Sequence, residues 1–201
     1  MEPARYGVDV GSQHVELPLV ALSESLTLAL LITVDMGVEF MATAGNELAS
    51  LLAPGGVEVV ATIATMGIPV AIEVTRALGL DQYVLLHKTP KIHLGDAISE
   101  AVTSITTASE QRLLLDRARI DAVAGKRVAL VDDVISTGAS TTTAMRLLRG
   151  VGANVVAIGS LLTEASVWKS SLGADADLVH ALGSVPIFRP GSAGLVEDWQ
   201  G

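Results

Sequence analysis

The feature that most constrains this chain is a series of short, almost wholly aliphatic runs that alternate with helical patterns. Residues 57–63, 126–132 and 154–162 are such runs, and each predicts a strand that is buried on both faces. Hydrophobic residues make up 50% of the chain but aromatic residues only 3%, so Ala, Val, Leu and Ile must fill the core. This composition favours an α/β fold with a central parallel sheet flanked by helices.

Helical patterns follow the strands closely enough to imply right-handed crossovers. Helices are predicted over 38–52, from Gly67 to Gly79 and over 140–151, with glycine or proline at several of their ends. In a sheet built this way, ligands bind at the carboxyl ends of the strands. The remaining expectations are strands at 17–20, 26–34 and 82–87, a loop at 89–99, and a hairpin formed by 102–107 and 111–116.

Composition also excludes several classes of function. The chain has 201 residues, which suggests one domain, and no cysteine, which excludes disulfides, zinc–thiolate sites, iron–sulfur clusters and thiol catalysis. Its net charge of −9 argues against a nucleic-acid partner or an anionic membrane held by bulk charge. The four histidines show no metal-ligand spacing. No targeting segment or bilayer-length apolar stretch is visible, so we expect a cytoplasmic protein with no membrane partner.

The segment most informative about chemistry is residues 128–141, with the sequence VALVDDVISTGAST. Four apolar residues predict a buried strand, and Asp132 and Asp133 are expected at its carboxyl end. A loop of small and hydroxylated residues then leads into a helix, whose N-terminus favours an anion. Gly138 allows the backbone to approach a phosphate closely. The residues expected to hold that phosphate are Ser136, Thr137, Gly138, Ala139, Ser140 and Thr141.

The two adjacent carboxylates need a different partner, because they would repel a phosphate. Ribose hydroxyls, or waters on a magnesium ion, suit Asp132 and Asp133. The segment therefore predicts a site for a ribose 5-phosphate, with the phosphate in the loop and the sugar on the acidic residues.

This segment resembles the signature of the type I phosphoribosyltransferases, which bind phosphoribosyl pyrophosphate (PRPP). A looser resemblance over 57–188 is most like the adenine phosphoribosyltransferase branch. It implies a central parallel sheet with flanking helices, in a core of about 36–162. It also implies a small hood from about 1–35 and 163–201, Mg²⁺ bound together with PRPP, and a homodimer.

The resemblance further implies a pyrophosphate site. The first phosphoribosyl loop corresponds here to Ala64, Thr65, Met66 and Gly67, and the last three are the expected pyrophosphate contacts. The adenine branch usually has Glu and Arg where this chain has Ala64 and Met66, so backbone amides would have to bind the pyrophosphate here. Lys88 lies just after a predicted strand, where the family places a basic residue, and Lys91 would approach when the loop closes.

The base and the proton-transfer group are less defined. Thr106 stands where the adenine branch carries a glutamate, and neither Glu100 nor Glu110 is in register, so no general acid or base is assigned. Enzymes for 6-oxopurines usually have an aspartate where this chain has Ser136, which favours adenine, orotate or an unusual base. Ile135 is a candidate apolar contact for the base, and equally a candidate core residue.

Two functions of different classes remain open. The first is an enzyme that transfers the phosphoribosyl group of PRPP to a nitrogenous base, with adenine or a related purine favoured and an orotate-type activity as a variant. The second is a PRPP-binding regulator without turnover, favoured by the residues at Ala64, Met66 and Thr106. Pyrophosphate release with a panel of bases separates the two.

Overall fold

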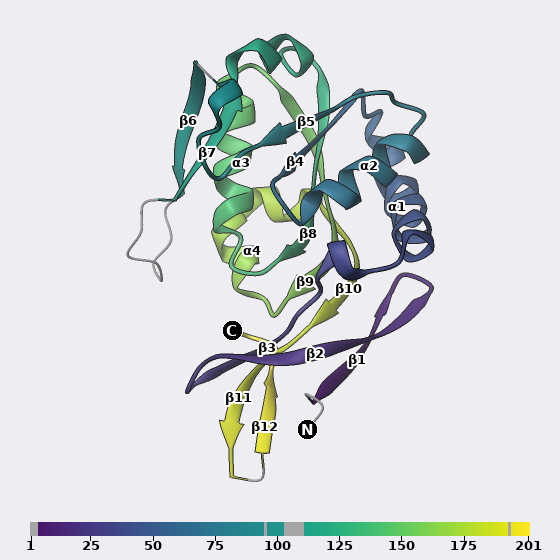
Figure 1. Cartoon of the computed structure of the whole chain (residues 1–201), viewed down its shortest axis with the longest axis vertical. Helices are drawn as coiled ribbons and strands as arrows, with labels where there is room; N and C mark the ends of the chain where they lie inside the picture. Colours follow the sequence, from purple (N-terminus) through teal and green to yellow (C-terminus); the bar gives the residue numbers. More distant parts are fainter. Residues whose placement is uncertain (1–3, 95, 103–110, 193) are drawn as a thin grey trace.

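The structure is a computed structural model that describes residues 4–94, 96–102, 111–192 and 194–201. A core of helices and strands forms one end of the molecule. An antiparallel sheet, built of strands from the beginning and the end of the chain, forms the other (Figure 1). No helix in these ranges is long and apolar enough to cross a membrane.

The core is built on a five-stranded sheet with the order β10-β9-β8-β4-β5, in which every neighbouring pair is parallel. This arrangement confirms the fold class expected from the aliphatic runs. Strand β8 occupies the centre, so residues at its carboxyl end lie between neighbours on both sides. The strands are β4 (Val59–Ile63), β5 (Tyr83–Leu86), β8 (Arg127–Ile135), β9 (Asn154–Glu164) and β10 (Val179–Val185).

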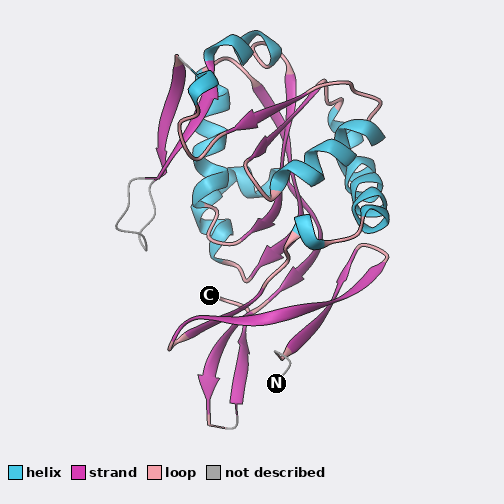
Figure 2. Cartoon of the chain, in the orientation of Figure 1, coloured by secondary structure: helices cyan, strands magenta, loops and turns pink. Residues whose placement is uncertain are grey.

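Helices cover both faces of this sheet (Figure 2). Strand β8 shows why, because its side chains alternate between two buried clusters. Ala129 and Val131 belong to the cluster that includes helices α1 and α2, whereas Val128 and Leu130 belong to the one that includes α3 and α4. The helices are α1 (Val38–Leu52), α2 (Gly67–Ala77), α3 (Ala139–Gly150) and α4 (Val167–Leu172).

The second sheet is the hood, with the order β1-β2-β3-β11-β12 and only antiparallel pairs. Pairing of β11 with β3 joins the two ends of the chain, and the Tyr6 and Phe188 rings pack edge to face with centroids 5.1 Å apart. The hood strands are β1 (Arg5–Val10), β2 (Gln13–Ser23), β3 (Leu26–Ala29), β11 (Ile187–Gly191) and β12 (Gly194–Asp198).

The structure corrects the expected boundary between core and hood. Residues 163–201 were all assigned to the hood, but β10 lies in the parallel sheet, so the chain returns to the hood only at β11. At the other end, the strand expected over 26–34 stops at Ala29 and is followed by a 3-10 turn, Thr33–Asp35.

The second strand of the predicted hairpin is present, because β7 (Gln111–Asp116) has the predicted bounds. Its partner β6 is Ala97–Val102, half of which lies in the segment expected to be a loop, and residues 103–107 of the predicted first strand lie outside the described residues. The end of β5 is attached to this hairpin, because His87 and Leu114 exchange backbone hydrogen bonds of 2.9 and 2.8 Å. Besides Thr33–Asp35, 3-10 segments occur at Ala53–Gly55, Ile92–Leu94, Arg117–Ala122 and Gly173–Leu178.

Candidate active site

The two carboxylates of the motif lie within β8. The sequence analysis ended this strand at Asp132, but pairing with β9 continues to Ile135, opposite Thr163. The strand extends because Val134 and Ile135 resume the apolar pattern after the acidic pair, and Ile135 is only 1% exposed. Ile135 therefore belongs to the buried core, and its role as an apolar contact for a base stays a prediction.

Asp132 lies in an environment that disfavours its negative charge. Burial raises the pKa of the Asp132 carboxyl well above its ordinary value, the nearby charge of Asp133 raises it further, and the charge of Lys88 opposes both effects. The carboxyl oxygen Oδ1 of Asp132 also accepts the backbone N–H of Asp133 at 3.1 Å. Two adjacent carboxylates, one of them buried, are complementary to a cation or to hydroxyl donors, because either would stabilise their negative charge.

The segment after β8 forms a turn that enters α3. Gly138 has φ +78°, and a Cβ there would lie 3.1 Å from Cβ of Ser171 and 3.2 Å from Cα of Trp168, both in α4. Glycine is thus required by the left-handed conformation and by the close approach of α4. Helix α3 begins at Ala139, and its N-cap residue, Gly138, has no side chain to cap the first turn. Its first backbone N–H groups are therefore suited to an anion.

The hydroxyl residues of this turn differ in exposure. Thr137 is exposed, and its Oγ1 accepts the Ala139 N–H at 3.4 Å. Ser136 and Ser140 are partly buried, whereas Thr141 is 4% exposed. Within the expected phosphate loop, Thr137 is thus the exposed residue, while Gly138 is buried against α4 and Thr141 is packed at the base of the loop.

The expected pyrophosphate loop lies next to Asp132. It follows β4, which pairs directly with β8, and an ideal Cβ on Gly67 would lie 2.7 Å from Oδ1 of Asp132 and 2.2 Å from Oγ1 of Thr62. The carbonyl of Met66 accepts the Thr33 hydroxyl at 2.6 Å, and the Ala64–Thr65 peptide bond is cis. Thr65 is exposed. The fold thus brings together two loops that are far apart in sequence.

We expect Gly67→Ala to disturb this contact between the loops. The added methyl group has no space beside Thr62 and Asp132, so we expect a loss of about 1–3 kcal/mol in the free energy of unfolding. Denaturant titration measures it. The matched control is Gly150→Ala, where the Cβ would meet nothing within 4 Å and φ is not positive. Equal stability of the two variants would contradict the packing described here.

The two lysines of the expected site differ in position. Lys88 lies two residues after the end of β5 and is exposed, and its positive charge slightly lowers the pKa of the Asp132 carboxyl. Lys91 is also exposed and lies three residues further on, just before the Ile92–Leu94 turn. The charge of Lys88 thus acts on Asp132, whereas no such effect of Lys91 is seen among the described residues.

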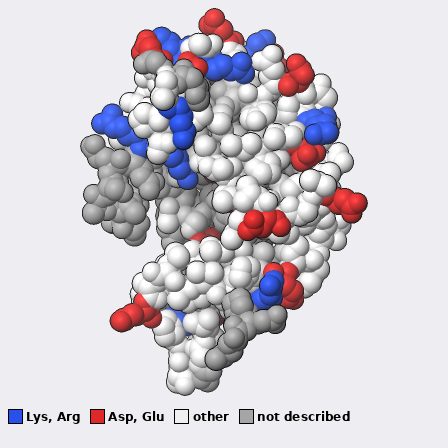
Figure 3. Space-filling model, viewed as in Figure 1, with Lys and Arg blue, Asp and Glu red and all other residues white. Residues whose placement is uncertain are grey.

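A cavity of about 480 Å³ adjoins the phosphate loop, between the hood and the carboxyl ends of β8 and β9. In Figure 3 the surface is hollowed between core and hood. The cavity contains a residue that the sequence analysis missed, Glu164, which is 5% exposed and accepts a hydrogen bond from the Ser136 hydroxyl. Burial raises the pKa of Glu164, and the hydrogen bond from Ser136 partly offsets that effect. The sequence offered one signal for Glu164, which is a carboxylate two residues after the end of the apolar run 154–162.

None of the three positions considered for proton transfer, Thr106, Glu100 and Glu110, is assigned as a general acid or base. Thr106 and Glu110 lie outside the described residues. Glu100 lies on β6, where Oε1 accepts a hydrogen bond from Nε of Arg146 in α3 at 3.1 Å. Within the described part of the chain, no group of three or more His, Asp or Glu residues is arranged to hold a metal ion by itself.

Comparison with known proteins agrees with this geometry. Residues 36–180 match the phosphoribosyl transferase domain family. A xanthine phosphoribosyltransferase of Agathobacter rectalis is 31% identical over 118 residues, 59% of this chain and 60% of that protein. The purine biosynthesis transcriptional repressor PurR of Bacillus subtilis is 29% identical over 118 residues, 59% of this chain and 40% of the repressor. Orotate phosphoribosyltransferases are also among the relatives.

Solved structures show the same fold. An adenine phosphoribosyltransferase from Rhodothermus marinus superimposes with a TM-score of 0.61 at 18% identity, covering 90% of this chain and 94% of the other. The chain matches only 40 to 60% of the length of the first curated relatives. The family match, residues 36–180, includes strands β4, β5, β8 and β9 and both candidate loops.

Proposed function

Because this chain belongs to the phosphoribosyl transferase domain family, we propose that it transfers the 5-phosphoribosyl group of PRPP to a nitrogenous base and releases pyrophosphate. The observation that carries the proposal is the convergence at the carboxyl ends of β4, β5 and β8. Gly67, Lys88 and the carboxylate of Asp132 follow or end three adjacent strands. A sugar with phosphates at both ends needs such a site.

Each part of PRPP has a matching part of the chain. The 5′-phosphate would bind the turn at residues 136–141, where Gly138 makes no side-chain cap at the N-terminus of α3 and the helix dipole favours an anion. Asp132 and Asp133 would accept hydrogen bonds from the ribose hydroxyls. The pyrophosphate would lie between Lys88 and the backbone of Thr65, Met66 and Gly67. The site thus spans two loops joined by the Gly67–Asp132 contact.

The reaction needs little covalent chemistry from the protein. A ring N–H nitrogen of the base forms a bond to C1′ of the ribose and loses its proton to solvent. The C1′–oxygen bond breaks, and its electron pair leaves with pyrophosphate. Magnesium bound with PRPP would neutralise part of the pyrophosphate charge. Lys88 would stabilise the charge that grows on the leaving group, and Asp132 and Asp133 would orient the sugar and accept hydrogen bonds from waters on the metal.

We propose adenine or a related purine as the base. Ser136 supports this choice, since enzymes for 6-oxopurines usually carry an aspartate at that position. The relatives include both xanthine and orotate enzymes, and an orotate-type activity is the alternative that we keep. The cavity of about 480 Å³ beside Ser136 is large enough for either ring system.

A PRPP-binding regulator without turnover is the second candidate. The observation that favours it is the first phosphoribosyl loop, where Ala64 and Met66 supply no charged side chain. A relative named as a transcriptional repressor matches over 118 residues, so the fold is also used in a regulator.

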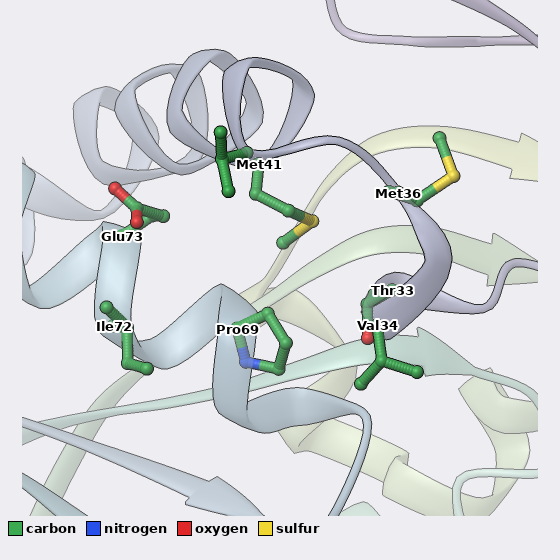
Figure 4. Close-up of a pocket in the computed structure, with 8 residues that line it drawn as sticks. Thr33, Val34, Met36, Met41, Pro69, Ile72 and Glu73 are labelled. Atoms are coloured by element: carbon green, nitrogen blue, oxygen red, sulfur yellow. The ribbon is translucent and has the colours of Figure 1, made fainter.

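We also propose that the protein forms a homodimer. A groove of about 310 Å³ between the start of α1 and helix α2 is lined largely by apolar side chains, including Met41, Pro69 and Ile72 (Figure 4). At its edge Val34 is 55% and Val38 84% exposed. A second copy would remove these side chains from water. Light scattering after size exclusion measures the mass, and a monomer at micromolar concentration would contradict the proposal.

The test of the proposed reaction is pyrophosphate release. We would incubate the protein with PRPP, magnesium and, separately, adenine, hypoxanthine, xanthine, guanine, orotate and uracil. Release with adenine, accompanied by adenosine monophosphate, is the expected result. Saturable PRPP binding without release from any base would favour the regulator.

A further inference from the structure

The cavity between hood and core is mostly apolar, with few polar groups. Leu26 and Leu28 of the hood and Val167 of the core provide apolar wall, while Ser136 and Glu164 provide polar atoms on the core side. On the hood side Arg189 lines the cavity, and its Nε donates to Asp198 at 2.7 Å. Apolar walls with a few convergent polar groups are the usual setting for a flat organic ligand.

Strand register places Ser136 and Glu164 together. Ile135 of β8 pairs with Thr163 of β9, so the next residue of each strand comes to the same edge of the sheet. There the Ser136 hydroxyl donates to Glu164 Oε2. The Glu164 side chain is thus one of the polar groups in a cavity, although it is nearly inaccessible to bulk solvent.

The backbone after Glu164 is held in an unusual conformation. Ala165 has φ +47°, which is uncommon for a residue with a Cβ. Its N–H donates to the Val185 carbonyl at 2.8 Å, and its carbonyl accepts the Trp168 indole N–H at 3.2 Å. Neighbouring elements therefore fix this position, as is common beside functional groups. The Glu164 carboxyl is thereby anchored at the wall of the cavity.

We propose that Ser136 and Glu164 act together as the group that recognises one edge of the base, while the apolar walls pack on its ring faces. The proposal rests on the proposed function and names the residues that determine which base enters. Burial favours the neutral carboxyl of Glu164, which presents one donor hydrogen beside an acceptor oxygen. The pair therefore fits a heterocycle whose edge places a hydrogen-bond acceptor next to an N–H donor.

Two substitutions at Glu164 separate this role from mere packing. Glu164→Ala removes both hydrogen-bonding atoms, and we expect the Kd for the base to rise about tenfold or more. Glu164→Gln keeps one donor and one acceptor, so we expect it to restore the Kd to within about threefold. The Kd for PRPP with magnesium should stay within about twofold in both. Glu197→Ala, in a hood glutamate that does not line the cavity, is the control.

The probes are adenine, hypoxanthine, xanthine, orotate and uracil, titrated by calorimetry into the full chain. Circular dichroism checks folding, and Glu164→Met, which removes the carboxyl group but keeps a side chain of similar length, replaces Glu164→Ala if the latter does not fold. An unchanged base Kd, equal losses for base and PRPP, or a parent that binds none of the five would overturn the proposal. Pyrophosphate release with a base Kd insensitive to Glu164→Ala overturns this inference alone. Base binding that depends on Glu164 without any release overturns the transferase and supports the pair.

Discussion

Replacing both Asp132 and Asp133 with asparagine is expected to raise the Kd for PRPP by roughly 100-fold or more. Each carboxylate, as a charged acceptor for ribose hydroxyls, should contribute about 1.5–3 kcal/mol. Burial and the charge of Asp133 raise the pKa of Asp132, and both effects are opposed when the ligand brings positive charge and hydroxyl donors to the carboxylate. Titration calorimetry with magnesium present measures the effect.

The Asp132→Asn part of this double substitution is expected not to lower the stability of the folded protein. Because the folded state raises the pKa of Asp132, the protein favours the protonated carboxyl. That contribution is complete below the ordinary aspartate pKa and is lost as the pH rises through the raised value. Asparagine does not ionise, so Asp132→Asn should preserve or increase the Tm at pH 7.5 relative to the parent. We therefore expect a folded variant with poor affinity.

The control for the double variant is Asp81→Asn with Asp121→Asn, which removes two exposed carboxylates elsewhere and changes the net charge equally. It should leave the Kd for PRPP within about twofold, as is usual for surface substitutions. Unchanged affinity in a folded Asp132→Asn, Asp133→Asn protein would contradict the assignment of the ribose site.

Lys88→Ala is expected to lower the turnover rate by roughly 100- to 1,000-fold, with little effect on the Kd for the nucleotide product. In the product complex the leaving pyrophosphate is absent, and Lys88 has no partner on the ligand. In the transition state negative charge grows on pyrophosphate, and only interactions that strengthen there raise the rate. Loss of one preorganised donor typically costs about 2.7–4 kcal/mol.

The comparison uses turnover and nucleotide Kd at fixed magnesium. Lys126→Ala is the matched control, because Lys126 is another exposed lysine, paired with Glu58 at 3.3 Å beside the amino end of β8. It should change neither quantity. Equal losses of turnover and nucleotide binding in Lys88→Ala, or no loss in either, would reject the role of Lys88 at the leaving group.

Regular local patterns allowed much of the core to be predicted. Helix α1 has the bounds expected from its periodicity and the Pro54–Gly55 stop, and β7 likewise has the predicted bounds. The turn into α3 followed from its glycine and hydroxyl residues. The hood was harder, since β1 and β2 have mixed polarity and one largely exposed face. The hood sheet is completed by β11, which pairs with β3 and comes from the other end of the chain.

Within the site, the sequence analysis identified Gly67, Lys88 and Asp132, because each lies at or just after the carboxyl end of one predicted strand. It ended β8 too early because two carboxylates interrupt the apolar run, and only pairing with β9 shows that the strand continues. It missed Glu164 because the partner of that carboxyl, Ser136, is 28 residues away and meets it only through strand register. Tertiary contacts of this kind cannot be derived from spacing in one segment.

The most direct test of the PRPP site is the crystal structure of the protein with PRPP and magnesium at saturating concentration. We expect the 5′-phosphate in the turn at residues 136–141 and the ribose hydroxyls on Asp132 and Asp133. The pyrophosphate should lie between Lys88 and the backbone at Gly67. PRPP bound at another place, or a saturated crystal with no ligand at the end of β8, would contradict the proposed function.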